Sequence, residues 1–261
     1  MIKAVKRINN NSTIALSGFS YMNPPMELVR EIIRQKKKNL TLISGPTSGI
    51  ETDMLIGAGC VKQLITACVS FEKICSVAPN FKKFYEEDKI KLWECDEAIW
   101  HLALKAGIEN KKFIFWEGAV GTSIPELNRD ILEVKRNEIY YLKIPAIKPD
   151  FSIVHCTYAD KDGNLAFTPN LFRGRMFCEK ELVKAGKVVI AQVEKIVEKL
   201  PKNKDLHIGK ANHVFEIPKG CYPGASNGMY APDLDHYKLY VDYCNKNKFQ
   251  EYLEKYVYIR K

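Results

Sequence analysis

The residues best suited to chemistry are small ones that gather in a turn after an apolar run. Residues 40–43 read as a short strand, and residues 44–49 continue as Ser-Gly-Pro-Thr-Ser-Gly. Small residues at the carboxyl end of a strand let a ligand approach the backbone closely, as in open α/β sheets. Gly18, Gly45 and Gly49 are therefore candidate ligand-approach positions, although ordinary βα turn geometry explains them equally well.

Other common kinds of site find no support in the sequence. The eight cysteines form no C-x-x-C pair and the five histidines no H-x-x-x-H or H-E-x-x-H, so we expect reduced thiols, no disulfide framework and no metal site. No G-x-x-x-x-G-K-[ST] motif is present to hold a nucleoside triphosphate. His155 ends an apolar strand, where a hydrogen-bonded core histidine is more common than a catalyst.

Composition indicates an ordinary globular protein. Its 261 residues are 46% hydrophobic and 27% charged, enough for a substantial core. No window approaches 18 consecutive apolar residues, and residues 1–13 lack the apolar region of a secretory signal. We therefore expect a cytoplasmic protein that does not enter a membrane.

The net charge of +9 is spread along the chain. Its one tight run, Lys36 to Lys38, follows a helical stretch, where cations favour a helix C-terminus. No basic stripe interleaved with aromatic residues and no nucleic-acid motif is found, so we expect no nucleic-acid partner. A basic surface can still attract an anionic ligand.

Predicted strands alternate with predicted helices along the chain. The strands cover 13–16, 40–43, 61–69, 89–93, 113–116, 152–156, 188–193 and 213–217, and the helices cover 26–35, 80–87, 96–106, 179–185 and 234–256. Asn80 and Asp96 are possible N-caps, and residues 123–148 are predicted to form an excursion with a short hairpin. The alternation predicts an α/β fold, an open and mostly parallel sheet with helices on both faces, in one domain spanning residues 1–261.

Short motifs in a fixed order carry a resemblance to a known family. The most distinctive block is Asp53-Met54-Leu55-Ile56-Gly57 with Gly59, Val61 and Lys62; the others include Gly18-Phe19, Pro25, Val29-Arg30-Glu31-Ile32, Pro149-Asp150, His155, Ala159-Asp160, Gly163-Asn164, Pro218, Gly220, Pro223, Gly228 and Tyr230. From about residue 12 to residue 258 the chain resembles the α subunit of family I coenzyme A transferases, particularly that of glutaconate CoA-transferase.

The resemblance implies a CoA-transferase-like fold that pairs with a homologous β subunit, often as α2β2, with the active site between the subunits. It also implies acyl-CoA and carboxylic acid ligands: the coenzyme A thioester is a substrate, and no cofactor is bound permanently. The transferase nucleophile is a glutamate in a Ser-Glu-Asn-Gly motif of the β subunit. Residues 226–228, Ser-Asn-Gly, lack that glutamate, so we expect the chain alone to be inactive.

Glu97 departs from the transferase pattern. Transferase α subunits commonly place a glutamine at this helix start, where its amide helps to hold an oxyanion, and an ionised glutamate cannot donate such a hydrogen bond. The α subunits of steroid ring-opening CoA-ester hydrolases, which the chain also resembles, have a glutamate here that looks catalytic. Glu97 is therefore our catalytic candidate, and a carboxylate that stabilises its helix through the dipole is the equal alternative.

The resemblance and the strand order extend the predicted substrate-binding set to Gly18, Phe19, Gly45, Gly49, Ser70 and Glu72. Glu72 aligns near a serine that looks substrate-facing in glutaconate transferases, and a solvated turn carboxylate is the alternative. Arg173 and Arg175 could meet a substrate carboxylate or a CoA phosphate, and a surface role is the alternative.

Three functions follow from these observations. The first is the α subunit of a heteromeric acyl-CoA transferase that works through a glutamyl-CoA intermediate on the partner β subunit. The second is the α subunit of a CoA-ester C–C bond hydrolase that uses Glu97 as its catalytic base. The third is a non-catalytic acyl-CoA-binding module that kept the fold.

Overall fold

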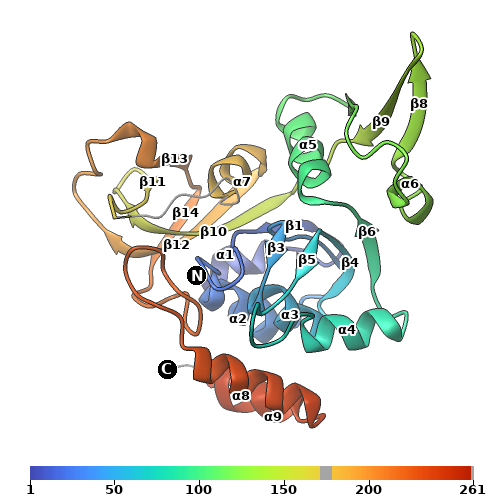
Figure 1. Ribbon diagram of the computed structural model, residues 1–261. Helices are drawn as coiled ribbons and strands as arrows, with labels where there is room; N and C mark the ends of the chain where they lie inside the picture. The colour runs from blue at the N-terminus through green and yellow to red at the C-terminus, as the bar shows by residue number, and fades with distance from the viewer. Residues whose placement is uncertain (171–177, 260–261) are drawn as a thin grey trace.

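A mostly parallel sheet forms the centre of the molecule in the computed structural model, which describes residues 1–170 and 178–259 (Figure 1). Its parallel strands follow the spatial order β14 (His213–Glu216), β12 (Val188–Ile196), β10 (Phe151–Ala159), β1 (Thr13–Leu16), β2 (Leu40–Ile43), β4 (Val61–Thr66) and β6 (Lys91–Glu94). Antiparallel β11 (Asn164–Ala166) and β13 (His207–Lys210) extend it beside the second half of β10. The predicted sheet is confirmed.

Helices cover both faces of this sheet, as predicted. Side chains alternate across a strand, so Ile14 and Leu16 of β1 belong to one hydrophobic core and Ala15 to the other. The first core is closed by α1 (Ile2–Lys6), α2 (Met26–Arg34), α3 (Ile50–Gly57), α4 (Pro79–Glu86), α8 (Leu234–Asn245) and α9 (Phe249–Leu253). The second is closed by α5 (Glu97–Ile108) and α7 (Glu179–Ala185), with the short α6 (Ile124–Leu127) at its margin.

A second, antiparallel sheet projects away from the body as an arm, residues 113–145 (Figure 1). Its strands lie in the order β7 (Phe113–Trp116), β9 (Ile139–Pro145) and β8 (Leu132–Arg136). The hairpin predicted within residues 123–148 is therefore confirmed. The segment that follows the arm is joined to α5, because the Ile147 amide donates a hydrogen bond to the Ala103 carbonyl, 3.1 Å away.

Two expectations about the first half of the chain are wrong in detail. The predicted strand 61–69 divides at Ala67, and its last residues form β5 (Cys68–Val69), which pairs with β3 (Thr47–Ser48) outside the central sheet. Asn80 does not cap α4, which begins one residue earlier at Pro79. Its buried amide instead donates to Asp53 on α3 at 3.0 Å, a contact between helices that no local pattern encodes.

The carboxyl-terminal helix is also interrupted. The predicted helix 234–256 ends at Asn245 because Asn247 takes a positive φ of 57°, and α9 begins only at Phe249. One wide helical turn, residues 254–258, completes this end of the chain.

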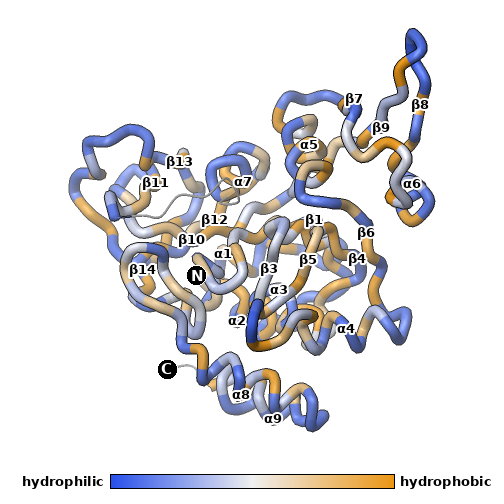
Figure 2. The backbone as a smooth tube through the Cα atoms, viewed as in Figure 1, coloured by the Kyte–Doolittle hydropathy of each residue, from blue (hydrophilic) through white to orange (hydrophobic). Residues whose placement is uncertain are grey.

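Hydropathy follows the architecture. Hydrophobic residues concentrate in the central strands, whereas the loops and the outer faces of the helices are largely hydrophilic (Figure 2). Within residues 1–170 and 178–259, no helix has both the length and the apolar character needed to cross a bilayer.

Candidate functional site

Four parallel strands bring the predicted site residues to one edge of the sheet. β1, β2, β4 and β6 are neighbours in register, so their carboxyl ends lie side by side. The loops that leave these ends contain residues 17–20, 44–49 and 67–72 and the start of α5 at residue 97. Ligands of open α/β sheets bind outside such an edge, so we place the candidate site here.

Glu97 is the first residue of α5 and is half-buried. The predicted cap is confirmed, because Asp96 accepts a hydrogen bond from the Ile99 amide at 2.7 Å. The Glu97 carboxylate accepts a hydrogen bond from the Thr47 hydroxyl, with Oγ1 and Oε1 2.9 Å apart. A residue in the turn after β2 therefore fixes the position of the Glu97 side chain. Stabilising the dipole of α5 would not require this hydrogen bond.

Two ionisable side chains, Cys68 and His101, interact electrostatically with Glu97. Partial burial raises the pKa of the Cys68 thiol, and the nearby carboxylates of Glu72 and Glu97 raise it further. Burial lowers the pKa of His101, one turn along α5, while Glu181 and Glu97 oppose that shift. Cys68 is exposed on β5, and both shifts favour the uncharged forms, the thiol of Cys68 and the neutral imidazole of His101.

Ser70 and Glu72 belong to one tight turn. The Ser70 hydroxyl accepts a hydrogen bond from the Glu72 amide at 3.0 Å, and the Ser70 side chain is buried. Glu72 has a φ of 49° and an exposed side chain. Ser70 thus shapes the turn that presents Glu72 toward Cys68, and the substrate-binding role of both residues stays a prediction.

The candidate glycines pack two loops against each other. A Cβ on Gly45 would lie 2.2 Å from the Gly18 carbonyl oxygen, and one on Gly49 would lie 2.1 Å from that of Ser20. Gly18 has a φ of 134°, a region that side chains other than hydrogen rarely allow. The close approach at Gly45 and Gly49 is made by the neighbouring loop. Phe19, which lies between Gly18 and Ser20 in the sequence, is half-buried.

A buried carboxyl group that the sequence did not reveal lies beneath these loops. Glu51 on α3 is fully buried and accepts a hydrogen bond from the Gly49 amide at 2.8 Å. Burial raises the pKa of Glu51 to about 7. Burial also raises the pKa of Glu179 to about 7 and that of Asp53 to about 6. The core therefore holds several acids whose pKa values burial shifts toward neutrality.

A second polar group gathers around His155. Ligand atoms of His155, Glu194 and Cys221 lie within 4.8 Å of one another, and all three residues are buried. Their wide separation in sequence left this arrangement without a spacing signal, although such a set could hold a metal ion. In the structure these atoms are hydrogen-bonded: His155 contacts Ser226 at 3.0 Å and Gln192 at 3.2 Å.

The protonation of this group matches a structural role. Burial lowers the pKa of His155 to about 3, so its imidazole is neutral at physiological pH. Burial raises the pKa of the Cys221 thiol well above its usual range. Glu194 accepts hydrogen bonds from the Tyr230 hydroxyl at 2.8 Å and from the Lys219 amide at 2.7 Å. The group ties the loop after β14 to the sheet, consistent with a hydrogen-bonded core histidine.

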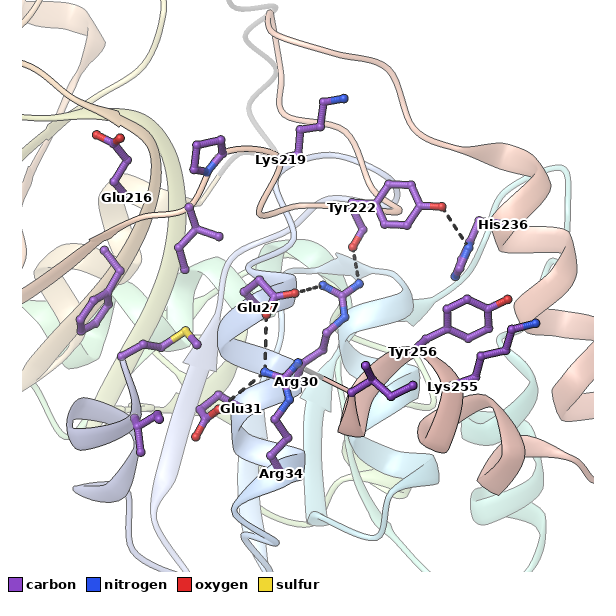
Figure 3. Close-up of a pocket in the computed structure, with 16 residues that line it drawn as sticks. Glu27, Arg30, Glu31, Arg34, Glu216, Lys219, Tyr222, His236, Lys255 and Tyr256 are labelled. Carbon is purple, nitrogen blue, oxygen red and sulfur yellow. Dashed lines mark hydrogen bonds and ion pairs between the residues drawn. The ribbon is translucent and has the colours of Figure 1, made fainter. Parts of the chain in front are cut away.

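A cavity of about 540 Å³ lies away from these residues, between α2, the loop after β14 and the end of the chain (Figure 3). Arg30 contacts Glu27 at 2.6 Å and the Tyr222 carbonyl at 2.5 Å, and Arg34 donates to the Val257 carbonyl at 2.6 Å. The guanidinium groups therefore join three segments of the chain. None of the predicted site residues lines this cavity. Arg173 and Arg175 lie outside the described residues.

A comparison of the sequence with known families identifies the family of this chain. The profile described as "Coenzyme A transferase" matches residues 1–107 and 119–211. The chain belongs to the coenzyme A transferase family. Glu97 and every predicted substrate-binding residue fall within the matched ranges.

Individual relatives include enzymes of two kinds. A 3-oxoadipate CoA-transferase subunit of Pseudomonas knackmussii is 28% identical to this chain, over 98% of the chain and 91% of the relative. The cholesterol ring-cleaving hydrolase IpdA subunit of Rhodococcus jostii is 25% identical, over 92% and 84%. The coenzyme A transferase chain therefore has relatives named as transferase subunits and as hydrolase subunits.

A solved structure confirms the fold. The glutaconate coenzyme A-transferase of Acidaminococcus fermentans superposes with a TM-score of 0.90 at 22% identity, covering 100% of this chain and 88% of that one. The predicted CoA-transferase-like architecture is thus confirmed.

Replacing Gly45 with alanine tests the contact between the two loops. We expect the Gly45→Ala variant to lose roughly 2–3 kcal/mol of unfolding free energy, because the new methyl group meets the Gly18 carbonyl. Urea denaturation measures this loss. Gly121→Ala is the control, since its surroundings are open and only its φ of 75° resists a side chain, at a cost of about 1 kcal/mol. Equal stability of the Gly45 variant and the parent chain would contradict the packing argument.

Glu51 should make stability fall as pH rises. Below pH 4.5, the ordinary pKa, the Glu51 carboxyl is protonated in both the folded and the unfolded chain. Between pH 4.5 and about pH 7 the unfolded chain loses this proton while the folded chain keeps it. The free energy of unfolding therefore falls as the pH rises through this range. We expect Glu51→Gln to remove this part of the slope, gaining up to roughly 3 kcal/mol over the parent between pH 4.5 and pH 8. Urea titrations at several pH values measure the slope. Glu86→Gln, on the exposed side of α4, should leave it unchanged.

Proposed function

We propose that this chain is the α subunit of a heteromeric acyl-CoA transferase, which moves coenzyme A between carboxylic acids through a glutamyl-CoA intermediate on a partner β subunit. The match of the coenzyme A transferase profile to most of the chain carries this proposal. Relatives that are named as single subunits of such enzymes, such as that of Pseudomonas knackmussii, support a second chain.

The carboxyl edge supports the same proposal. Thr47 and Glu97 are half-buried, and Cys68 and Glu72 are exposed, so the candidate site is open to solvent on this chain. Acyl transfer through a tetrahedral intermediate requires fixed donors in a site from which water is excluded. A second chain closing over this edge would provide that exclusion and could bring the nucleophile.

The proposed reaction is a series of acyl exchanges between carboxylates and the CoA thiolate. A glutamate on the partner chain attacks the thioester carbonyl, the C–S bond breaks, and a mixed anhydride and CoA thiolate form. The thiolate attacks the glutamyl carbonyl and releases the first acid, leaving glutamyl-CoA. The acceptor carboxylate then attacks this thioester, and the thiolate returns to the new acyl carbonyl, which regenerates the glutamate.

This chain's residues would shape one wall of the pocket. The loops at Gly18 and Gly45 fix the Thr47 turn, and Ser70 fixes the Glu72 turn beside it. The hydroxyl of Thr47 is committed to Glu97 at 2.9 Å. An ionised Glu97 would repel a developing oxyanion, so on the transferase proposal the oxyanion must form away from it, near donors of the partner.

Trapping the intermediate tests the transferase proposal. The chain is co-expressed with the product of the neighbouring gene, and the purified complex is incubated with an acyl-CoA alone and with a free carboxylic acid. We expect CoA exchange only in the complex, and a covalent CoA adduct on the partner chain detected by mass spectrometry. Release of free CoA with no adduct and no exchange would contradict covalent transfer.

The hydrogen bond from Thr47 to Glu97 favours a second candidate function, a CoA-ester C–C bond hydrolase with Glu97 as catalytic base. A general base must be positioned and must remain accessible to the proton that it removes. Glu97 meets both conditions, because it is hydrogen-bonded to Thr47 and half-buried at the edge. The hydrolase subunit of Rhodococcus jostii among the relatives supports this alternative.

Replacing Glu97 with glutamine separates the two functions. If Glu97 is the base of a hydrolase, Glu97→Gln should lower kcat of the complex by roughly 10²–10⁴, the usual contribution of general base catalysis. Under the transferase proposal the exchange rate should stay within a few-fold of the parent, because the oxyanion then forms away from residue 97. Steady-state kinetics with both assays measure this.

Glu109→Gln serves as the matched control. Glu109 caps the opposite end of α5 and pairs with Lys111 at 2.6 Å, so its loss changes charge on the same helix far from the edge. If Glu109→Gln lowered turnover as much as Glu97→Gln, the effect would belong to the helix and the catalytic assignment would fail.

A further inference from the structure

The outer strand of the arm is an unpaired sheet edge. β8 lies at the end of the order β7–β9–β8, and no other strand among the described residues pairs with its outer side. The arm holds this edge away from the central sheet, where another chain could reach it (Figure 1). A free edge offers a row of backbone donors and acceptors that can pair with a further strand.

The hairpin turn determines which residues of β8 face outward. Arg136 pairs with Ile139 across a two-residue turn, Asn137 and Glu138, whose φ values of 47° and 64° are those of a type I′ turn. Such a turn closes with hydrogen bonding between Arg136 and Ile139. Backbone groups then alternate along the strand, so those of Glu133 and Lys135 point away from β9.

These two residues make the edge complementary to itself. In an antiparallel pair of β8 strands related by a twofold axis at Val134, Glu133 of each copy lies opposite Lys135 of the other. Their outward backbone groups then form about four hydrogen bonds. An axis at Glu133 or at Lys135 would also use the outward groups, but would place like charges opposite each other, which is unfavourable.

We propose that two copies of this chain associate through antiparallel pairing of their β8 strands about a twofold axis at Val134. The two arms then form one continuous antiparallel sheet, with Leu132 of each copy opposite Arg136 of the other. This inference does not rest on the proposed function, because it uses the arm alone.

The exposure of the arm's outer face agrees with this pairing. Leu132 and Ile139 are 48% and 46% exposed, and they lie on the same face as Val134. Pairing at Val134 brings the Leu132 and Val134 side chains of the two copies together on that face and removes apolar surface from water.

The charges of β8 are also the wrong pattern for blocking association. Protected edges carry charges that repel a second strand. Glu133 and Lys135 have opposite charges and each lies one residue from the axis, so Glu133 of one copy attracts Lys135 of the other in this register. In the single chain both have exposed local partners: Lys135 pairs with the nearly fully exposed Glu138 at 2.6 Å, and Glu133 accepts a hydrogen bond from the Gly121 amide at 3.1 Å.

Charge exchange within the strand tests the proposal on the full chain. Sedimentation equilibrium over a range of concentrations should show a mass approaching twice 29.9 kDa. Glu133→Lys and Lys135→Glu should each weaken self-association roughly tenfold or more, because each places like charges opposite one another in two symmetric pairs. The double variant Glu133→Lys with Lys135→Glu restores opposite charges and should restore the association.

Glu126→Lys is the matched control, since it makes the same charge change on the exposed α6 of the arm and should leave the association unchanged. A mass that stays at that of the monomer, 29.9 kDa, at every concentration would overturn the proposal. The proposal would also be overturned if the double variant is folded, as checked by circular dichroism, but does not regain self-association. These outcomes are read from mass, so they are independent of any transferase or hydrolase assay.

A disulfide cross-link tests the register directly. Val134 faces itself across the axis as a non-hydrogen-bonded pair, with Cα atoms about 4.5 Å apart, within reach of a disulfide. Under mild oxidation Val134→Cys should form a covalent dimer, whereas Glu138→Cys on the turn should not. Cross-linking of the Val134 variant to the partner β chain instead of to its own copy would assign the edge to that chain and overturn the proposal.

Discussion

The site depends on the contact between the loop after β1 and the loop after β2. That contact exists because Gly45 has no side chain where the Gly18 carbonyl must lie. It brings the Ser20 amide within 2.9 Å of the Thr47 carbonyl, which fixes the Thr47 turn. The turn in turn pairs with β5 and bonds to Glu97. A backbone approach thus sets the position of a carboxylate that lies some fifty residues further along the chain.

The elements of this fold could be predicted from sequence because their signals are local. Apolar alternation located β1 and β2 within their observed bounds, and Asp96 marked the start of α5. Contacts between distant segments could not be predicted in the same way. No sequence spacing indicates that β3 pairs with β5, or that the Glu51 carboxyl lies buried beneath the glycine loops. The hydrogen bond from Thr47 to Glu97 is a contact of the same kind.

The glycines show how a correct pattern can carry two meanings. Small residues at the carboxyl edge indicated a close approach, and the structure contains one, made by the protein's own carbonyl groups. A ligand at this edge would therefore meet the outward groups instead, the side chains of Cys68, Glu72 and Glu97. Carboxylates are poor neighbours for an acyl oxyanion, yet they suit proton removal. The electrostatics of the edge thus bear on chemistry more directly than its glycines do.

The helix α5 connects this edge to the arm. Its first residue is Glu97, and its later turns pack against the segment after β9, where the Ala103 carbonyl accepts a hydrogen bond from Ile147. The candidate site uses residues 18–97, whereas pairing through β8 uses residues 132–136. The two surfaces share no residue, so association of two copies through the arm would use none of the residues of the carboxyl edge. One rigid helix would then set the spacing between the two interfaces.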